Sequence, residues 1–211
     1  MSALLLSPAE ARVLASLVEK SVTTPQYYPM TVNAIMLAAN QKTSRSPVMN
    51  LSEGDIGNAL NRLEELRLVG RDSFSGRTQK WRQQFNTQLL LKPQTAALLV
   101  TLMLRGSQTL AELRANAAVL GGPTESEALA AALNDLADRA QPMITQLPRG
   151  AGQKEARYAQ TLCGDVAAGE WSEPEIPAIP GGRAEPGVIA ALEARIQALE
   201  ARLEELEKLW K

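Results

Sequence analysis

Histidine is absent from this 211-residue sequence, and cysteine occurs only once, at Cys163. A single cysteine cannot form an intramolecular disulfide, and without histidine no Cys/His zinc site can be assembled. Catalysis that depends on a histidine base is excluded as well. The sequence therefore predicts neither a metal nor a cofactor, and we expect that the protein is not an enzyme.

An excess of one charge is lacking too, since 22 lysines and arginines face 23 aspartates and glutamates. The distribution is uneven: residues 1–91 hold 10 basic and 7 acidic side chains (+3), residues 92–165 hold 7 of each, and residues 166–211 hold 5 and 9 (−4). Any affinity for nucleic acid is therefore expected in the first segment. No apolar run suffices for a secretory signal or a membrane span, which favours a cytoplasmic protein with no membrane partner.

Capping patterns and apolar spacing predict three helices in the first third of the chain. The stretch SPAE at 7–10 combines a serine cap with proline at the first helical position and glutamate at the third. A second, short helix is expected from Thr31 to about Ala39. A polar segment then leads to Ser52 and Asp55, which repeat the capping pattern before a third helix with an apolar stripe.

Two strands around a glycine turn are expected next. The segments RLVGRDSF (67–74) and QKWRQQF (79–85) flank SGRT. In the second segment apolar Trp81 and Phe85 alternate with cations, so one face is expected to point inward and the other to be basic. Three helices followed by a β-hairpin is the winged-helix pattern, which we assign to residues 1–90.

The same order recurs in residues 91–163, which we assign to a second winged-helix domain. An apolar helix is expected over 94–104, TLAE (109–112) and TESE (124–127) match further capping boxes, and MITQLPR and KEARYAQTL predict a second hairpin. The offset between matching segments falls from 85 at Thr24 and Thr109 to 73 at Leu63 and Leu136. The first copy therefore holds an extra loop of about 12 residues, for which the polar segment at 40–50 is the favoured place.

The C-terminal part predicts a linker and then a coiled coil. Residues 164–187 hold four prolines and five glycines, which is typical of a linker, and residues 188–211 form a heptad helix. The heptad pattern predicts a homo-oligomer, with a dimer favoured and a trimer left open. The predicted oligomerisation residues are Ile189, Leu192, Ile196, Leu199, Leu203, Leu206 and Trp210. The predicted fold class is thus mainly α with small β-hairpins (α+β), built from two tandem winged-helix domains, a linker and a C-terminal coiled-coil helix.

The run VTTPQYYPMTVNAIMLAANQKTSRSPVMNLSE at 22–53 resembles the signature of the YceH-like family of uncharacterised bacterial proteins. The resemblance covers about residues 6–162 and includes LMLRG at 102–106. It implies a bacterial cytoplasmic protein with two winged-helix domains, often followed by a coiled coil, and no assigned catalytic residues. Members often carry cysteine before NQK, where this chain has Ala39.

A helix-turn-helix derivative places its third helix in the major groove of DNA and its wing on phosphate. The candidate DNA-binding residues lie in the polar loop, on the exposed face of the third helix and on the first hairpin. They are Lys42, Arg45, Asn58, Asn61, Arg62, Arg71, Arg77, Lys80 and Arg82. Residues 67–82 hold five cations and one carboxylate, a local charge of +4. The acidic residues of the third helix oppose phosphate.

The sequence favours an oligomeric, regulatory protein that binds double-stranded DNA through its first domain. The alternative is an adaptor that uses paired winged helices to bind a protein partner and has no affinity for DNA. The basic hairpin of the first domain favours the first hypothesis. The second domain favours the alternative, because its third helix is expected to expose Glu127, Ala131, Asn134 and Asp138 and no cation.

Overall fold

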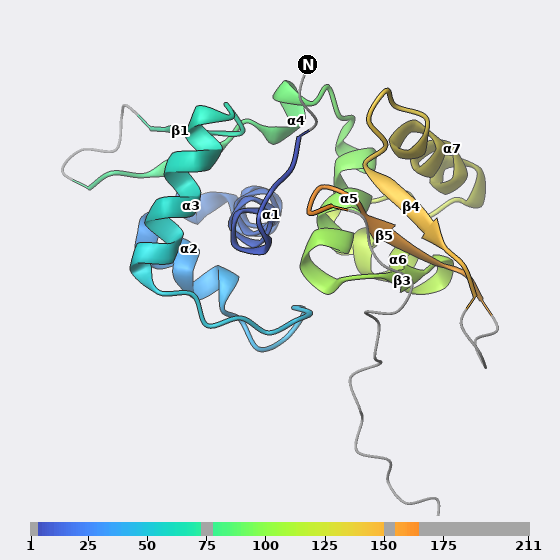
Figure 1. The fold of residues 1–211 in the computed structure, drawn as a ribbon, viewed down its shortest axis with the longest axis horizontal. Coiled ribbons are helices and arrows are strands. Elements are labelled where there is room, and N and C mark those ends of the chain that lie inside the picture. The colour runs from blue at the N-terminus through green and yellow to red at the C-terminus, as the bar shows by residue number, and fades with distance from the viewer. Residues whose placement is uncertain (1–3, 73–77, 150–154, 165–211) are drawn as a thin grey trace, which may run out of the picture. The chain divides into compact units, whose positions relative to one another are not determined.

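The computed structural model describes residues 4–72, 78–149 and 155–164 (Figure 1). The first helix, α1 (Pro8–Thr23), begins where the sequence predicts. The Ser7 hydroxyl accepts a hydrogen bond from the Glu10 N–H at 3.2 Å, and the Glu10 carboxylate accepts one from the Ser7 N–H at 3.0 Å. These bonds satisfy N–H groups for which the helix itself has no acceptor, so the predicted capping box is confirmed.

Two more helices follow in the first half of the molecule. A short 3-10 turn (Pro25–Tyr27) separates α1 from α2 (Val32–Ala39). The third helix, α3 (Glu53–Glu65), starts with the predicted box, in which the Ser52 hydroxyl accepts the Asp55 N–H at 3.2 Å. The three helices expected from capping and apolar spacing are therefore confirmed.

The first hairpin is shorter than the sequence predicts. Strand β1 (Val69–Arg71) pairs antiparallel with β2 (Trp81–Gln83), with Gly70 opposite Arg82. The expected strand at 79–85 ends early, because the chain turns into a short helix, α4 (Phe85–Gln88). Phe85 is fully buried as expected, but it reaches the core from a helical turn rather than from a strand. Residues 73–77 of the expected turn lie outside the described residues.

The second half repeats the order of three helices and a hairpin. Its helices are α5 (Pro93–Arg105), α6 (Leu110–Ala117) and α7 (Ser126–Ala137). The capping box at 109–112 is confirmed, with the Thr109 hydroxyl accepting the Glu112 N–H at 3.2 Å.

The second capping box expected in this half, TESE at 124–127, is wrong. Helix α7 starts two residues after Thr124, and the residue at its cap position, Glu125, makes no side-chain capping bond. The chain enters α7 from a tight turn, in which the Gly122 N–H donates to the Ala117 carbonyl at 2.9 Å. A Cβ atom on Gly122 would lie only 2.8 Å from that carbonyl oxygen, so the approach to α7 is set by the glycine turn.

The second hairpin carries one strand that the sequence did not predict. Strands β4 (Ile144–Leu147) and β5 (Arg157–Gln160) pair antiparallel as expected. A two-residue strand, β3 (Gln108–Thr109), adds to the other edge of β5, so the sheet has the order β3-β5-β4. The two residues of β3 lie just before α6, where the sequence suggests only a helix cap.

The extra residues of the first half are divided among three places. Helices α2 and α6 have the same length of 8 residues. The segments before α2 (24–31) and before α3 (40–52) are both longer than their counterparts before α6 (106–109) and α7 (118–125). Helix α1 is also longer than α5, with 16 residues against 13. The expectation that a single loop at 40–50 holds the whole insertion is therefore wrong.

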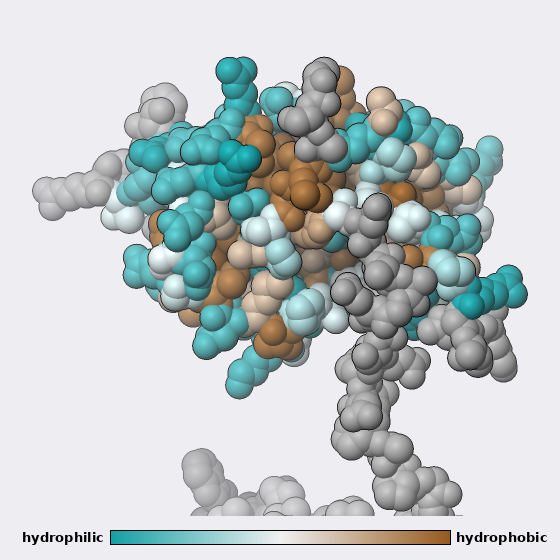
Figure 2. Space-filling model, viewed as in Figure 1, coloured by the Kyte–Doolittle hydropathy of each residue, from teal (hydrophilic) through white to brown (hydrophobic). Residues whose placement is uncertain are grey.

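One continuous hydrophobic core joins the two halves. Helices α1 and α5 pack against each other; α1 is buried over residues 11–18 and α5 along most of its length. Figure 2 shows hydrophilic residues over most of one face, with hydrophobic residues gathered toward its middle. All described residues belong to one compact unit. The division into domains at 1–90 and 91–163 stays a prediction, with its boundary between α4 and α5.

The described residues are mainly helical with two small antiparallel sheets, which confirms the predicted α+β class. Within these residues no helix is long and apolar enough to cross a membrane. The predicted linker beyond Gly164 and the coiled-coil helix at 188–211 lie outside the described residues.

Candidate nucleic-acid interface

Helix α3 turns one face to the core and the other to solvent. Ile56, Leu60 and Leu63 recur at helical spacing and are fully buried. Two of the predicted DNA-binding residues, Asn58 and Asn61, project from the opposite, exposed face. The next residue, Arg62, is exposed as well. The structure therefore brings these three predicted residues together on one accessible polar face.

The cations around this face are held by carboxylates. Arg62 pairs with Glu65 at 2.8 Å, one turn along α3, and Arg71 of the hairpin pairs with Glu64 of α3 at 3.0 Å. The Arg71 guanidinium also lies over the Trp81 ring, 5.1 Å from its centroid.

The strand β2 shows the same arrangement, because Arg82 is exposed and forms an ion pair with Asp72 beside β1. Lys80 is half-buried and directly precedes β2, and Arg77 lies outside the described residues.

These ion pairs reduce the positive potential that the sequence suggests. Between residues 53 and 82 the chain holds six cations and five carboxylates, a net charge of +1. The local charge of +4 counted for 67–82 is therefore largely offset by the acidic residues of α3, which lie beside the hairpin. Exposed ion pairs contribute only about 0–1 kcal/mol, so the guanidinium groups can exchange partners at little cost.

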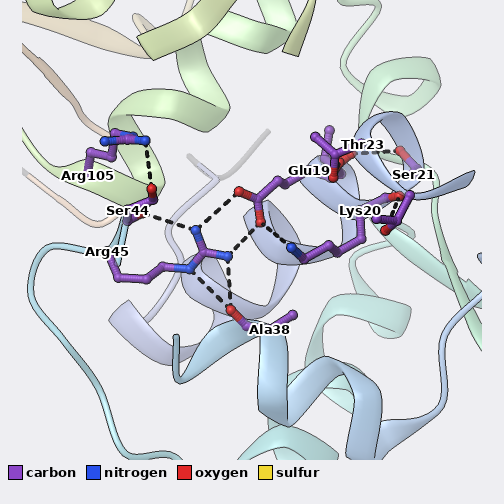
Figure 3. A network of polar contacts seen from close by, with 10 residues as sticks. Glu19, Lys20, Ser21, Thr23, Ala38, Ser44, Arg45 and Arg105 are labelled. Atoms are coloured by element: carbon purple, nitrogen blue, oxygen red, sulfur yellow. Dashed lines mark hydrogen bonds and ion pairs between the residues drawn. The ribbon is translucent and has the colours of Figure 1, made fainter. Parts of the chain in front are cut away.

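The predicted phosphate contact Arg45 belongs to the interior instead. Its side chain has no exposed surface. The guanidinium donates to the Glu19 carboxylate of α1 at 2.6 Å and to the Ala38 carbonyl of α2 at 2.9 Å (Figure 3). A group held in this way does not meet a phosphate, so we remove Arg45 from the candidate interface. Lys42, three residues earlier, is exposed.

A second buried arginine, Arg12, was missed by the sequence analysis. It lies in the middle of α1 and donates to the Ala39 carbonyl at 3.2 Å and to the Pro47 carbonyl at 2.7 Å. Burial, and then the nearby positive charge of Arg45, lower the pKa of Arg12 to about 10. The signal was a lone cation within the apolar run ARVLASLV, in which every neighbour faces the core.

The segment 40–52 is fixed by further bonds. Asn40 clamps its ends, because its side-chain amide donates to the Leu51 carbonyl and accepts the Leu51 N–H, both at 2.8 Å. The Ser46 N–H donates to the Leu104 carbonyl of α5 at 2.8 Å. Figure 3 also shows Arg105 donating to the Ser44 hydroxyl, at 2.8 Å. The run NQKTSRSPVMN is therefore a structural connection between the two halves.

The second half presents a different surface, which we call the α7 groove. It has a volume of about 890 Å³ and lies between α6, α7 and the β4–β5 hairpin, which Figure 1 places beside α7. Buried Leu129 and Leu133 of α7 and Ile144 of β4 form part of its apolar lining. The groove also holds two exposed arginines, Arg114 and Arg149.

These features define a mainly helical protein in which each half consists of three helices and an antiparallel hairpin. The chain belongs to the family described as "Protein of unknown function, DUF480", whose model matches residues 6–153. The predicted membership in an uncharacterised bacterial family of the YceH-like kind is thereby confirmed.

Three Burkholderia relatives described as UPF0502 proteins show how far the similarity extends. The protein of Burkholderia ambifaria (strain MC40-6) is 44% identical over 170 residues, which are 81% of this chain and 72% of the relative. That of Burkholderia pseudomallei (strain 668) is 45% identical over 165 residues, or 78% and 70% of the two chains. That of Burkholderia cenocepacia (strain HI2424) is 46% identical over 161 residues, or 76% and 68%.

Proposed function

We propose that this protein is a non-enzymatic, oligomeric regulator that binds double-stranded DNA through α3 and the β1–β2 hairpin. The observation that carries the proposal is the exposed face of α3, where Asn58, Asn61 and Arg62 point away from the core. Asparagine amides and guanidinium groups match the hydrogen-bonding edges of adenine and guanine in the major groove. The hairpin cations Arg71 and Arg82 would contact phosphate beside it.

The finer features of the fold belong to the same proposal. The repeated order of three helices and a hairpin supports two tandem winged-helix domains, with α3 as the recognition helix and β1–β2 as the wing. The heptad pattern of residues 188–211 supports a coiled coil that joins two copies. Two linked DNA-binding surfaces would raise the overall affinity without any new contact.

We expect the binding to be modest and strongly dependent on salt. A net charge of +1 over residues 53–82 leaves few cations free of a carboxylate. Each phosphate that is neutralised contributes a slope of about −0.9 to the logarithmic dependence of affinity on salt. Fluorescence anisotropy of a mixed-sequence duplex at about 50 and 200 mM salt measures this slope with full-length protein.

Two charge changes on α3 give the proposal a sharp test. Arg62→Glu should weaken duplex binding at least about tenfold, whereas Glu65→Gln should strengthen it, because it releases Arg62 and removes a repulsive charge. Arg149→Glu is the matched control, with the same change of charge on the second hairpin, and should leave the affinity unchanged. Equal effects of Arg62→Glu and Arg149→Glu, or no binding at the lower salt, would overturn the proposal.

The second candidate function is that of a protein-binding adaptor, and one observation favours it. The α7 groove is an apolar surface of a size that is typical of binding sites. None of the exposed residues of α7 itself, among them Glu127 and Asn134, is a cation, and Asp138 follows the helix directly, so a duplex is disfavoured at this helix. The two candidates use different halves of the molecule and are compatible with each other.

A further inference from the structure

Small side chains on one side of α7 make the groove hollow. Ser126, Ala130, Asn134 and Ala137 follow one another at spacings of three and four residues, and all four are exposed and line the groove. On an α-helix this spacing places them along a single face for three turns, roughly 16 Å. Leu110 of α6, whose exposed fraction is 44%, lines the same groove. The groove is therefore long and mainly apolar. Exposed hydrophobic surface of this kind is typical of an interaction site.

The charges of the groove point to the chemistry of its ligand. Most arginines in the described ranges have a side chain that donates to a carboxylate or another oxygen; Arg67, Arg114 and Arg149 do not. Two of these three, Arg114 of α6 and Arg149 beyond β4, line the α7 groove. One carboxylate, Glu155, lines it too, so the net charge of the groove is +1.

We propose that the α7 groove binds an amphipathic helix of a partner protein, one with an apolar stripe flanked by acidic residues. A helix laid along α7 would place its stripe at i, i+3, i+4 and i+7 over Leu110 and the small residues of α7. Its flanking carboxylates would reach Arg114 and Arg149. This inference names the partner chemistry of the adaptor function and does not depend on DNA binding by α3.

The few cations and the apolar lining disfavour a nucleic-acid ligand at the groove. A duplex needs several cations along its backbone, whereas the groove offers two arginines and one opposing carboxylate. The leucine, isoleucine and alanine side chains of the lining cannot donate a hydrogen bond to phosphate. An acidic amphipathic helix uses both parts of the site, because its apolar stripe covers the leucines and its carboxylates meet the arginines.

Two synthetic peptides test the proposal against full-length protein. Both are fluorescein-labelled 14-residue helices with leucine at the stripe positions, one with glutamate and one with lysine at the flanking positions. Anisotropy should show micromolar binding of the glutamate peptide and at least about fivefold weaker binding of the lysine peptide, since an exposed charge contact contributes about 1 kcal/mol. Arg114→Glu should reverse the preference.

A matched pair of variants tests whether the peptide binds in the α7 groove. Ala130 and Ala131 are both exposed on α7, but only Ala130 lines the groove. Ala130→Tyr fills the groove and should weaken binding of the glutamate peptide at least about tenfold, whereas Ala131→Tyr should leave it unchanged. Circular dichroism confirms that both variants fold. Duplex binding should be the same in both, which separates this inference from the DNA-binding proposal.

Five results would overturn the proposal. Wild-type protein that binds neither peptide, or both equally, contradicts it, as does an Ala130→Tyr variant that still binds the glutamate peptide. Self-association that Ala130→Tyr abolishes in sedimentation would assign the groove to a second copy of the chain. Peptide binding that appears only in a Leu199→Glu/Leu203→Glu variant would assign it to residues 188–211.

Discussion

Arg12 and Arg45 are two arginines whose side chains are buried, and Glu19 forms an ion pair with Arg45. Arg45 pairs with Glu19 directly, whereas Arg12 bonds only to backbone carbonyls. A buried charge is costly unless hydrogen bonds compensate it, and these two side chains donate to α1, α2 and the segment 40–52, although the buried Arg12 Nε has no partner among the described residues. The polar segment 40–52, which the sequence suggests as a phosphate-binding loop, is therefore hydrogen-bonded to the interior of the fold.

The first prediction concerns the ion pair of Arg45 and Glu19. Arg45→Met should destabilise the protein by about 2–3 kcal/mol, because it leaves the largely buried Glu19 carboxylate with only the longer ion pair to Lys20, at 3.6 Å. Urea denaturation followed by circular dichroism measures the change. The double variant Glu19→Gln/Arg45→Met should recover part of the loss, since it removes the largely buried negative charge as well.

Lys42→Met is the matched control within the same segment. Lys42 is exposed, so its replacement should change the stability by no more than about 0.5 kcal/mol. A stable Arg45→Met variant that binds DNA more weakly than the wild type would contradict the internal role of Arg45.

The second prediction concerns Cys163. Burial raises the pKa of this thiol. Two smaller influences are a hydrogen bond with Gln160, which lowers the pKa, and the charge of Glu10, which raises it. The thiolate is the reactive form, so alkylation by iodoacetamide at pH 8 should be slower in the folded protein than in urea, and should speed up as the pH rises further. Mass spectrometry of timed samples measures both rates. Equal rates in folded and unfolded protein would contradict the burial of the thiol.

At the scale of elements, the sequence was informative wherever a structure depends on residues close together. Three of the four expected capping boxes form, and all six helices predicted from apolar spacing are present. The fourth box does not form, because the turn at Gly122 precedes α7 and the helix begins only at Ser126. The residues 124–127 do not indicate that turn. Strand β3 was missed for a similar reason, since its two residues exist as a strand only through pairing with distant β5.

The third prediction compares two of these boxes. Ser52→Ala removes a cap that is formed and should cost about 1 kcal/mol of unfolding free energy. Thr124→Ala alters a residue that caps nothing and should stay within about 0.5 kcal/mol of the wild type. Thermal unfolding under identical conditions measures both variants. A larger loss for Thr124→Ala than for Ser52→Ala would contradict the described start of α7.

At the scale of the whole molecule, the contacts between the two halves could not be predicted from the sequence. Periodicity shows that α1 and α5 each have apolar faces, but not that they pack on each other. The bonds from Ser46 and from Ser44 to the end of α5, and the Leu6 N–H that donates to the Leu162 carbonyl at 2.7 Å, join residues far apart in sequence. The candidate interface shows the same limit, because its residues were found but their pairing with carboxylates was not.

The fourth prediction follows from the shared core. Residues 4–164 should unfold in one cooperative transition, even though the sequence predicts two domains, because removing either half exposes the buried faces of α1 and α5. Calorimetry should give equal calorimetric and van't Hoff enthalpies. Two resolved transitions, or hydrogen exchange that releases one half well before the other, would contradict this expectation.

The clamp of Arg12 and Arg45 also bears on how sequences in this family can change. Both guanidinium groups hold the segment 40–52 and α2 through backbone carbonyls, which every amino acid supplies. These hydrogen bonds therefore place no demand on the side chains of the residues that contribute the oxygens, whereas Arg45 and Glu19 are coupled and should be replaced together or not at all. Arg12 has no carboxylate that could be exchanged along with it, so it should be the slowest of the three to diverge.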